Sequence, residues 1–384
     1  MTAPDLAPVR AFLDDRHAAF AASVSAFAAR ELRARPEPAD DAAGRREARV
    51  LLSAMGKAGV FAPIGAADWR GCCLAREALA AASPLADAVF ALQGLGLVPI
   101  LLSGNAAMRE RWLGPTLAGE AMAAFAMTET GAGTDVASLA TSARRDGDHY
   151  VLDGAKCFIS NAGIADYYSV FATTDPAAGS RGIGCFVVPA GTPGLRYVGP
   201  QVLSSPHPLG EIALEGCRVP ATNRLGEEGR GFALGLKTLD RLRATVGAAA
   251  CGMAARALSE ALAHARARRQ FGKPLGEFQL VQEKLARMAT DLTAARLLVY
   301  RAAHAADGGA ERVTLEAAMA KLYATEAAQR IVDDAVQVLG GAGVLAAHPV
   351  DRLYRSVRAL RIYEGTSEIQ HLVIAGLLLH EGGA

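Results

Sequence analysis

The stretch "EFQLVQEKLARMATDLTAARLLVYRAA", residues 277–303, places apolar side chains at alternating steps of three and four residues. This spacing follows the period of an α-helix and gathers the apolar side chains into one stripe. A stripe of this kind is typical of a helix that packs at a shallow angle in a bundle. Its members are Phe278, Val281, Leu285, Met288, Leu292, Ala295, Val299 and Ala302. The stretch therefore predicts a long helix within a helical bundle.

The sequence before this helix predicts another helix with a sharp end. "RRQFGKP", residues 268–274, places basic residues after a helical stretch and then Gly272 and Pro274. Cations stabilise the carboxyl end of a helix, while glycine and proline end it. We therefore expect long helices from about residue 236 onward.

Between about residues 123 and 235 the sequence predicts strands. Short runs rich in aromatic and β-branched residues are separated by Gly, Pro, Asp and Asn; they include "HYVLDGAKCFIS" (149–160), "YYSVFATT" (167–174) and "GEIALEGCRV" (210–219). Short strands at this spacing predict a small antiparallel sheet or barrel.

Residues 5 to about 122 are rich in alanine and predict helices, with Phe20, Val24 and Phe27 on one face. The helical pattern stops at "GVFAPIGAADWRG", residues 59–71, where glycine and proline predict a loop. Helices, then strands, then helices together predict an α+β fold.

Composition excludes several functional classes. The 384 residues suffice for two or three domains, and 51% hydrophobic with 21% charged residues is ordinary for a soluble globular protein. Lys plus Arg (40) and Asp plus Glu (39) leave a net charge of +1, which offers no footprint for nucleic acid or an anionic membrane. We find no targeting signal and no uninterrupted apolar run of transmembrane length; "HLVIAGLLLH" (371–380) is too short to span a bilayer.

Cysteine and histidine spacing gives no sign of a metal site. The six cysteines include no C-x-x-C pair, and the eight histidines form no H-E-x-x-H motif. Scattered cysteines are typical of reduced thiols, so we expect a cytoplasmic protein without a metal.

Gly341, Gly343 and Ala346 formally match the dinucleotide fingerprint G-x-G-x-x-A. That fingerprint must follow a strand and open a helix. Here it follows the helical stretch "TEAAQRIVDDAVQVLGG" (325–341), so we interpret the glycines as a helix end.

Other motifs have ordinary explanations when each is taken alone. "AMTETGAGTD" (126–135) is either a loop or a cradle of N–H and hydroxyl groups for a polar heterocycle or phosphate. "RRQFGK" alone is a basic helix end, and Glu364 in "RIYEGTSEIQ" (361–370) alone is a solvated acid.

Taken together, six motifs occur in the order and spacing of one family. They are "TETGAGTD", "GAKCFISNAGIAD", "VPATNRLGEEGRGF", "RRQFGKPLGEFQ", "QVLGGAGV" and "IYEGTSEIQ". The chain closely resembles the acyl-CoA dehydrogenases from roughly residue 90 to residue 380. The resemblance implies an N-terminal helical domain (1–122), a middle β-barrel domain (123–235) and a C-terminal four-helix bundle (236–384). It also implies a homotetramer, because the family builds part of each FAD site from a neighbouring subunit.

The resemblance assigns cofactor contacts by motif position. Phe125, Met127 and Thr128 correspond to residues that line the flavin ring, Phe158 and Ser160 to a tryptophan and a threonine beside it, and Thr134 to a serine near the diphosphate and thioester. Arg268, Gln270 and Phe271 correspond to contacts with the neighbour's FAD, as do Gln337, Gly340 and Gly341. Thr366 and Glu368 correspond to positions near the diphosphate and ribose.

The resemblance also assigns the chemistry. Acyl-CoA dehydrogenases remove a proton from Cα of the thioester while a hydride leaves Cβ for flavin N5. Glu364 matches the catalytic base of the short- and medium-chain branches, and burial should raise the pKa of this carboxyl. Other branches place the base where this chain has Leu242, which cannot accept a proton. Arg243, Gly365 and Thr134 correspond to substrate contacts.

Four departures from the family pattern leave the acyl group open. Thr130 replaces a proline, and Phe158 replaces the usual tryptophan. A glycine-rich loop of the family has no clear match near "GAADWRGC" (65–72), and "PHPLGEIAL" (206–214) is unusual. Straight, branched and cyclic acyl chains all remain candidates.

We therefore expect an FAD-dependent acyl-CoA dehydrogenase that forms trans-2-enoyl-CoA and passes electrons to an electron-transfer flavoprotein. The alternatives are an oxidase-like or decarboxylating relative, a flavin-carrying nucleic-acid-binding protein of the same fold, and a non-catalytic subunit. The near-neutral charge disfavours nucleic acid, and the presence of Glu364 and both halves of the FAD motifs disfavours a non-catalytic subunit.

Overall fold

The computed structural model describes residues 5–381 and divides the chain into two compact units. The first, here called the helical unit, comprises Met1–Arg35, Asp68–Asp87 and Asp240–Ala384. The second, here called the sheet unit, comprises Pro36–Ala67 and Ala88–Leu239. Each unit is described by itself.

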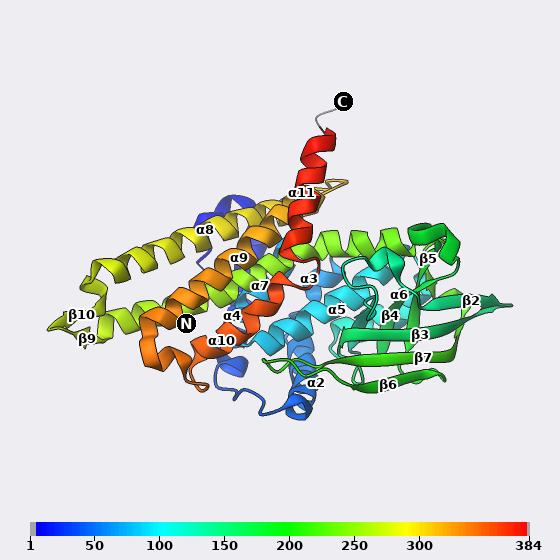
Figure 1. The fold of residues 1–384 in the computed structure, drawn as a ribbon, viewed down its shortest axis with the longest axis horizontal. Helices are drawn as coiled ribbons and strands as arrows, with labels where there is room; N and C mark the ends of the chain where they lie inside the picture. The colour runs from blue at the N-terminus through cyan, green and yellow to red at the C-terminus, as the bar shows by residue number, and fades with distance from the viewer. Residues whose placement is uncertain (1–4, 382–384) are drawn as a thin grey trace. The chain divides into compact units, whose positions relative to one another are not determined.

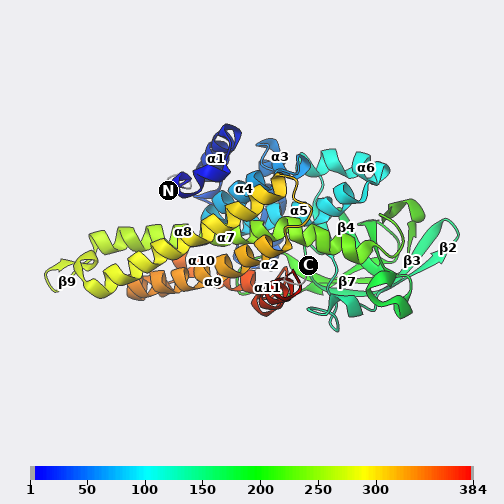
Figure 2. The ribbon, with the colours of Figure 1, turned by 90° about the horizontal axis from the view of Figure 1, so that it is seen from above.

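The helical unit is built around two long helices, α8 (Gln279–Asp307) and α9 (Thr314–Leu339). They lie side by side (Figures 1 and 2), and α10 (Pro349–Val357) and α11 (Ser367–Glu381) pack against α9. Its other elements are η1 (Ala7–Phe12), α1 (Asp15–Phe27), η2 (Ala28–Leu32), α4 (Trp69–Ala82), β9 (Arg269–Gln270), β10 (Lys273–Pro274), η6 (Leu275–Glu277), η7 (Gly340–Val344) and η8 (Arg358–Arg361).

The apolar stripe of α8 is confirmed over most of its length. Every stripe member from Met288 to Ala302 is buried. Phe278, at the N-cap, and Val281 and Leu285, in the first two turns of the helix, are only half-buried. The first part of α8 therefore lacks full cover within the chain.

Two helices contribute residues to both units. α7 (Gly231–Ala267) begins before residue 236, so the expected boundary at 235/236 lies inside a helix; the three domain boundaries remain predictions. The end of α7 before the β9–β10 turn is confirmed, and Gly272 occupies that turn with φ +80°. α5 (Pro84–Ser103) is the one helix of residues 5–381 that is long and apolar enough to cross a membrane. Since 78% of its apolar window is buried, it has the character of a core helix.

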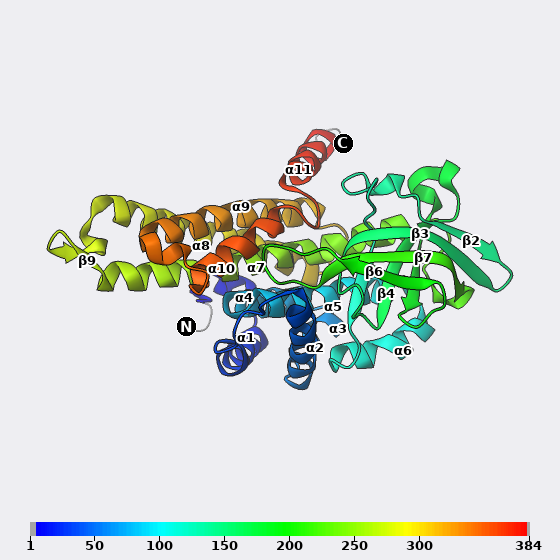
Figure 3. The ribbon, with the colours of Figure 1, turned by 60° about the horizontal axis from the view of Figure 1, so that its bottom comes forward.

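The sheet unit contains an eight-stranded sheet in the order β6-β7-β3-β2-β4-β5-β8, with β1 paired to β4. Figure 3 shows β6, β7 and β3 as neighbours. The strands are β1 (Ala123–Ala126), β2 (Ser142–Asp146), β3 (His149–Ser160), β4 (Tyr167–Thr173), β5 (Ile183–Pro189), β6 (Leu195–Pro200), β7 (Leu209–Pro220) and β8 (Arg224–Leu225).

The sheet curves around one core. Leu152 of β3, Phe186 of β5 and Ile212 of β7 belong to a single buried cluster, although their strands are spread along the pairing order. The pairing is mostly antiparallel, as predicted, but β1 lies parallel to β4. The sequence did not predict this, because β1 pairs with a strand that begins more than forty residues later.

Six further helices belong to the sheet unit among the described residues. They are α2 (Asp41–Lys57), α3 (Ala62–Gly65), α6 (Ala106–Leu117), η3 (Val136–Ser138), η4 (Pro176–Gly182) and η5 (Ala221–Asn223). The stretch predicted as a loop at residues 59–71 contains the one-turn helix α3, and α4 begins within it at Trp69. Pro63 suits this short helix because it lies in the first turn, where its missing N–H has no intrahelical partner.

Candidate active site

Glu364 lies in a strained turn between η8 and α11. Its φ is +55°, and Gly365 follows with φ +95°. A left-handed backbone costs a non-glycine residue free energy, and such residues cluster at functional sites. A Cβ atom at Gly365 would come within 2.4 Å of Gln370 Nε2, so glycine suits this position both sterically and conformationally. The turn therefore fixes the direction of the Glu364 carboxylate, and its backbone is locally strained.

Helix α9 holds this turn in place. Lys321 Nζ donates a hydrogen bond to the carbonyl of Gly365 at 2.7 Å. Further along α9, Glu326 accepts hydrogen bonds from Arg361 Nε at 2.7 Å and Ser367 Oγ at 2.6 Å. These contacts fasten both sides of the turn to a rigid helix.

Burial and nearby positive charges have opposite effects on the pKa of the Glu364 carboxyl. The residue is half-buried, but its Oε2 atom is buried and has no hydrogen-bond partner among the described residues. Burial raises the pKa of the Glu364 carboxyl above 4.5, while the positive charges of Arg76, Arg243 and Lys321 oppose that rise. A buried carboxylate whose pKa is raised accepts a proton more readily than an ordinary surface carboxylate.

A buried ion pair lies beside Glu364. Arg76 donates to both oxygens of Asp87, at 2.8 and 2.9 Å, and to Thr245 Oγ1 at 3.0 Å. Burial disfavours the charge of Arg76, but the Asp87 carboxylate more than offsets this and raises the pKa of Arg76. Sequence reasoning did not select these residues. The available signal was a charged Arg-Glu pair inside the apolar stretch "CCLAREALAAA" (72–82).

The helical unit also brings Arg243 of α7 near the Glu364 carboxyl, on which its charge acts. Arg243 is buried, its NH1 group donates to Asp240, and its Nε atom has no partner among the described residues. Leu242 is buried as well, so no acid occupies that position. Lys321, which sequence reasoning also missed, carries no motif signal beyond being a lysine at a core position of α9.

In the sheet unit, β3 lies beside the "AMTETGAGTD" segment. Lys156 Nζ donates to the carbonyl of Met127 at 3.1 Å, and the backbone N–H of Cys157 donates to the carbonyl of Thr128 at 3.1 Å. The Phe125 ring contacts Phe171 with centroids 4.8 Å apart. Met127 and Thr128 are thus brought next to the strand that carries Phe158 and Ser160.

Glu129 closes the loop that follows Thr128. Its carboxylate accepts from Lys156 Nζ at 2.7 Å and from the backbone N–H groups of Ala140 and Thr141 at 2.6 and 2.9 Å. Burial favours the neutral acid, but these hydrogen bonds prevail and lower the pKa of Glu129. Thr134, within the same loop, is exposed. The buried pair therefore sets the shape of the segment that carries three predicted flavin contacts.

Phe158 and Ser160 differ in exposure and bonding. Phe158 is 60% exposed, and its backbone N–H donates to Gln201 Oε1. Ser160 Oγ lies 2.7 Å from His207 Nε2. Burial, with the nearby charge of Arg45, lowers the pKa of His207 to about 4, so this imidazole is neutral at physiological pH.

Left-handed backbone marks the predicted site residues. Among residues 5–381, five non-glycine residues have positive φ, and three of them are Phe158 (+54°), Phe271 (+50°) and Glu364 (+55°). Such conformations cost about 1–3 kcal/mol each and persist where the surrounding structure enforces them. Their coincidence with positions chosen from motifs supports a functional origin.

The residues predicted to contact a neighbour's cofactor are exposed. This holds for Arg268, Gln270, Phe271, Gln337, Gly340 and Gly341. Burial lowers the pKa of His264, and the charges of Arg268 and His348 lower it further, so the end of α7 lies near the segment between η7 and α10. Gly340 has φ +60° directly after α9, which confirms that these glycines end a helix and do not form a dinucleotide fingerprint.

The remaining predicted contacts lie at the start of α11. Thr366 Oγ1 accepts from the backbone N–H of Ile369 at 3.3 Å. The pKa of Glu368 is lowered by hydrogen bonds from its own backbone N–H and from Thr366. The chemical groups present fit FAD. Arg268 offers a guanidinium for a diphosphate, Phe158 offers an exposed aromatic ring for a flavin, and Thr128 and Ser160 offer hydroxyl groups for hydrogen bonds.

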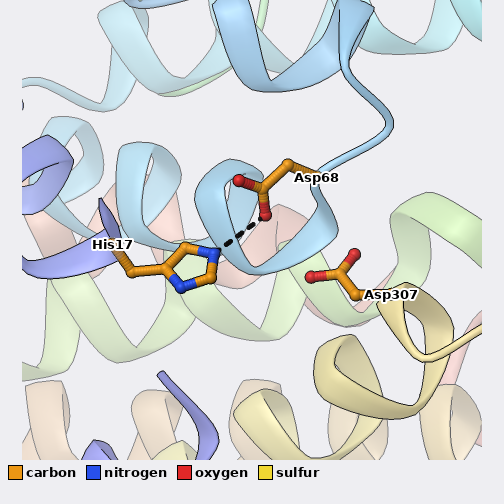
Figure 4. Close-up of side chains that lie close together, drawn as sticks. All are labelled: His17, Asp68 and Asp307. Atoms are coloured by element: carbon orange, nitrogen blue, oxygen red, sulfur yellow. Dashed lines mark hydrogen bonds and ion pairs between the residues drawn. The ribbon is translucent and has the colours of Figure 1, made fainter. Parts of the chain in front are cut away.

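His17, Asp68 and Asp307 form a cluster whose ligand atoms lie within 4.8 Å of one another (Figure 4). These atoms already have partners. Asp68 accepts from His17 and from the backbone N–H of Gly71, and Asp307 accepts from the backbone of Trp69 and from Arg70. The cluster is accounted for as the cap of α4.

Comparisons with known proteins identify the family. The chain matches the acyl-CoA dehydrogenase N-terminal domain over residues 14–120, the middle domain over 124–217 and the C-terminal domain over 229–379. It is 45% identical to a 3-(aryl)acrylate reductase of Clostridium sporogenes, over 73% of this chain and 75% of that protein. It is 42% identical to the caffeyl-CoA reductase-Etf complex subunit CarC of Acetobacterium woodii, over 73% of this chain and 74% of that protein.

A solved structure agrees over nearly the whole chain. Butyryl-CoA dehydrogenase from Megasphaera elsdenii superimposes with a TM-score of 0.89 and 36% identity, over 96% of this chain and 99% of that one. This chain belongs to the acyl-CoA dehydrogenase family. It is therefore an oxidoreductase with the N-terminal, middle and C-terminal domains of a family that dehydrogenates acyl-CoA with FAD.

Proposed function

We propose that Glu364 is the base that removes the Cα proton of an acyl-CoA thioester, giving trans-2-enoyl-CoA. The observation that carries this proposal is the orphaned, buried Oε2 atom of a carboxyl whose pKa is raised, held in a left-handed turn. Such a group has a raised proton affinity and a fixed direction, and its Oε2 atom has no competing hydrogen-bond partner in the part of the chain that the structure describes. Leucine at position 242 leaves the alternative location of the base without an acid.

The surrounding charges suit this role. Arg76, Arg243 and Lys321 stabilise the carboxylate that must be present before the proton is taken. When Glu364 accepts the proton, negative charge develops on the thioester oxygen, and the same cations favour that charge distribution. Backbone N–H groups of the strained turn are suited to polarise the thioester carbonyl, as the family resemblance implies for Glu364 and Gly365.

We propose that the protein binds FAD, which supplies the acceptor for the hydride from Cβ. Met127, Thr128, Phe158 and Ser160 would contact the isoalloxazine ring, and Arg268 of a second copy would bind the diphosphate. Two observations support this: the Lys156–Glu129 pair shapes the segment that carries Met127 and Thr128, and Phe158 presents an exposed ring. The protein supplies position and electrostatics while the cofactor carries the redox chemistry.

We propose a homotetramer. Large apolar side chains of the helical unit are exposed in the single chain, among them Phe271 (93%), Leu280 (81%) and Leu379 (80%). Exposed apolar area of this kind marks interaction surfaces. The half-buried start of the α8 stripe also supports an oligomer, because a bundle helix buries its apolar stripe along its whole length.

We further propose an electron-transfer flavoprotein as electron acceptor, a cytoplasmic location and a role in acyl-CoA catabolism. A relative at 42% identity is named as a subunit of a reductase-Etf complex, which supports the first. All six cysteines are buried thiols, which suits a reducing compartment.

The deciding experiment mixes the FAD-loaded protein anaerobically with butyryl-, octanoyl-, isobutyryl- and 3-phenylpropanoyl-CoA and follows flavin absorbance. At least one should bleach the flavin, and addition of an electron-transfer flavoprotein should restore it. Rapid restoration by oxygen would indicate the oxidase-like alternative, and CO₂ release from glutaryl-CoA the decarboxylating one. Bleaching by none of these compounds would contradict the proposal.

A second direction is favoured by a specific observation: two similar relatives are named reductases of arylacrylate compounds. The same residues can return the proton to Cα, because a catalytic base acts as an acid in reverse. Cinnamoyl-CoA added to the chemically reduced protein tests this direction, and re-oxidation of the flavin would support it.

A further inference from the structure

We propose that Lys321 is the positioning residue of the catalytic turn, which fixes the Glu364–Gly365 backbone through its hydrogen bond and fixes the Glu364 carboxylate through its charge. This inference rests on the proposed role of Glu364. Lys321 acts on the reaction through that residue.

The geometry of Lys321 is unusual for a lysine. Its side chain is buried at 0% exposure, two turns into α9. Buried lysines are rare unless paired, because removing an ammonium group from water is costly. The cost here is matched by one short contact, 2.7 Å from Nζ to the Gly365 carbonyl. A buried cation placed beside a functional turn in spite of this cost suggests that the contact is needed.

The contact acts where the backbone is strained. Gly365 directly follows Glu364, and both have positive φ. Among the described residues, the carbonyl of Gly365 has one other donor, Gln370 Nε2 at 3.1 Å. Removal of Lys321 would leave the Gly365 carbonyl with this longer bond from an uncharged donor. Glu326 would still hold the two sides of the turn, but its strained centre would relax toward ordinary backbone conformations.

The charge of Lys321 acts on the carboxyl as well. Burial lowers the pKa of Lys321 to about 8, while the nearby carboxylates of Glu364, Glu326 and Glu368 oppose the shift and Arg243 adds to it. The other groups that face Glu364 are Arg76 and Asp87. Below about pH 8 the lysine is charged and stabilises the Glu364 carboxylate; above it, the charge is lost and the pKa of Glu364 rises.

The test compares the FAD-loaded wild type with Lys321→Met, Lys321→Gln and Lys321→Arg. Lys284→Met is the matched control, because Lys284 is a partly buried lysine of α8 whose partner, Asp334, lies 13 residues (334 − 321) further along α9 than Lys321. The first measurement is hydrogen exchange of the peptide 361–370. Lys321→Met should increase exchange there about tenfold, as expected for loss of a charged hydrogen bond. Lys321→Arg and the control should stay near wild type.

The second measurement is the rate of flavin reduction by the acyl-CoA that the wild type oxidises fastest, as a function of pH. Lys321→Met should slow reduction at least about tenfold with little change in acyl-CoA affinity, and should move the acid limb to higher pH. Lys321→Arg should keep the rate near that of the wild type. It should also abolish the inflection near pH 8, because the lysine that loses its charge there is no longer present. Lys321→Gln lacks the charge, and its shorter side chain does not reach the Gly365 carbonyl, so it should both increase exchange and move the acid limb, as Lys321→Met does.

Two outcomes would overturn the inference: exchange of peptide 361–370 unchanged in Lys321→Met, or a pH profile unchanged in Lys321→Met and Lys321→Gln. If Lys321→Met does not fold, the Gln and Arg variants still decide between these outcomes. If no acyl-CoA bleaches the wild-type flavin, the proposed function fails, while hydrogen exchange still tests the positioning of the turn.

Discussion

Glu364 combines backbone and side-chain features that are unfavourable in a residue with a purely structural role. Its backbone is left-handed, its Oε2 atom is buried without a partner among the described residues, and burial raises the pKa of its carboxyl. Each feature costs stability. Strain and unsatisfied groups in a native structure are expected at the residues that perform the chemistry.

Replacement of Glu364 by glutamine should separate binding from catalysis. Gln is close in size and keeps the backbone of the turn, but it cannot accept the Cα proton. We expect FAD content and acyl-CoA affinity near wild type and a loss of about 10²–10⁴-fold in the rate of flavin reduction. Anaerobic stopped-flow absorbance measures this rate, and Glu316→Gln, at a surface pair with Arg301, is the control. Reduction at the wild-type rate would show that another group is the base.

Asp87→Asn should move the pH dependence of flavin reduction. The rate should rise with pH as Glu364 loses its proton, at a value above 4.5 because burial raises its pKa. The negative charge of Asp87 adds to that rise, so its removal should lower the pKa of Glu364 and shift the acid limb to lower pH. Asp291→Asn on α8 should leave the limb in place. A shift to higher pH would contradict this account of the site.

The same substitution should also be costly for folding. It leaves the buried guanidinium of Arg76 without its carboxylate, and breaking a buried pair typically costs about 3–5 kcal/mol. The thermal unfolding temperature of Asp87→Asn should therefore be well below that of the wild type. The rates of flavin reduction should be measured below the unfolding temperature of the variant.

At the scale of elements, two rigid pieces hold the segments that carry the predicted site residues. α9 fastens the turn of Glu364 through Lys321 and Glu326. β3 fastens the segment of Met127 and Thr128 through Lys156, whose Nζ contacts both the Met127 carbonyl and Glu129. Burial lowers the pKa of Lys156, and Glu129 opposes the shift. Sites built on supported elements keep their geometry better than unsupported loops.

Lys156→Met should therefore weaken FAD binding without touching the flavin directly. Glu129 would remain as a partly unpaired carboxylate, and its loop would lose the charge that draws it to β3. We expect FAD affinity to fall at least about tenfold, since charged hydrogen bonds are worth roughly 1.5–3 kcal/mol. Equilibrium dialysis measures this affinity. Arg218→Met removes an exposed pair with Asp146 in the same sheet and should leave FAD binding unchanged. Equal losses of FAD affinity in both variants would contradict this role of the Lys156–Glu129 pair.

At the scale of the whole molecule, a single chain leaves predicted contacts uncovered. Phe271, Gln337 and Gly340 are exposed, and so is Leu280 near the start of α8. An isolated chain would expose this apolar area to water, whereas a second copy would bury it. The proposed oligomer thus accounts for exposure in the same segments that the motifs assign to a neighbour's cofactor.

Arg268→Ala should weaken both FAD retention and oligomer assembly. The variant removes the guanidinium proposed to bind the neighbour's diphosphate, so FAD content after purification should fall and the oligomer should weaken. Arg266→Ala, two residues earlier and also exposed, should behave as wild type. Size-exclusion chromatography with light scattering and the ratio of flavin to protein absorbance measure both effects. A fully flavinylated monomer would rule out the shared site.

The sequence by itself determined the order of the elements and the family. Helix and strand periods are local properties, so the α8 stripe, the stop after α7 and the strand-rich middle could be predicted from neighbouring residues. Position 364 was identified from the motif around it. In the same way, the helical pattern that precedes Gly340 was enough to exclude a dinucleotide fingerprint, because that fingerprint needs a strand in front of it.

Only the tertiary structure decided what surrounds Glu364. Arg76, Asp87 and Lys321 lie 288, 277 and 43 residues away in the chain, and nothing in their local sequence announces that they converge. The parallel pairing of β1 with β4 and the left-handed turn at Glu364 were equally invisible. Charge, burial and backbone strain depend on which distant residues are packed together, and packing is a property of the folded chain as a whole.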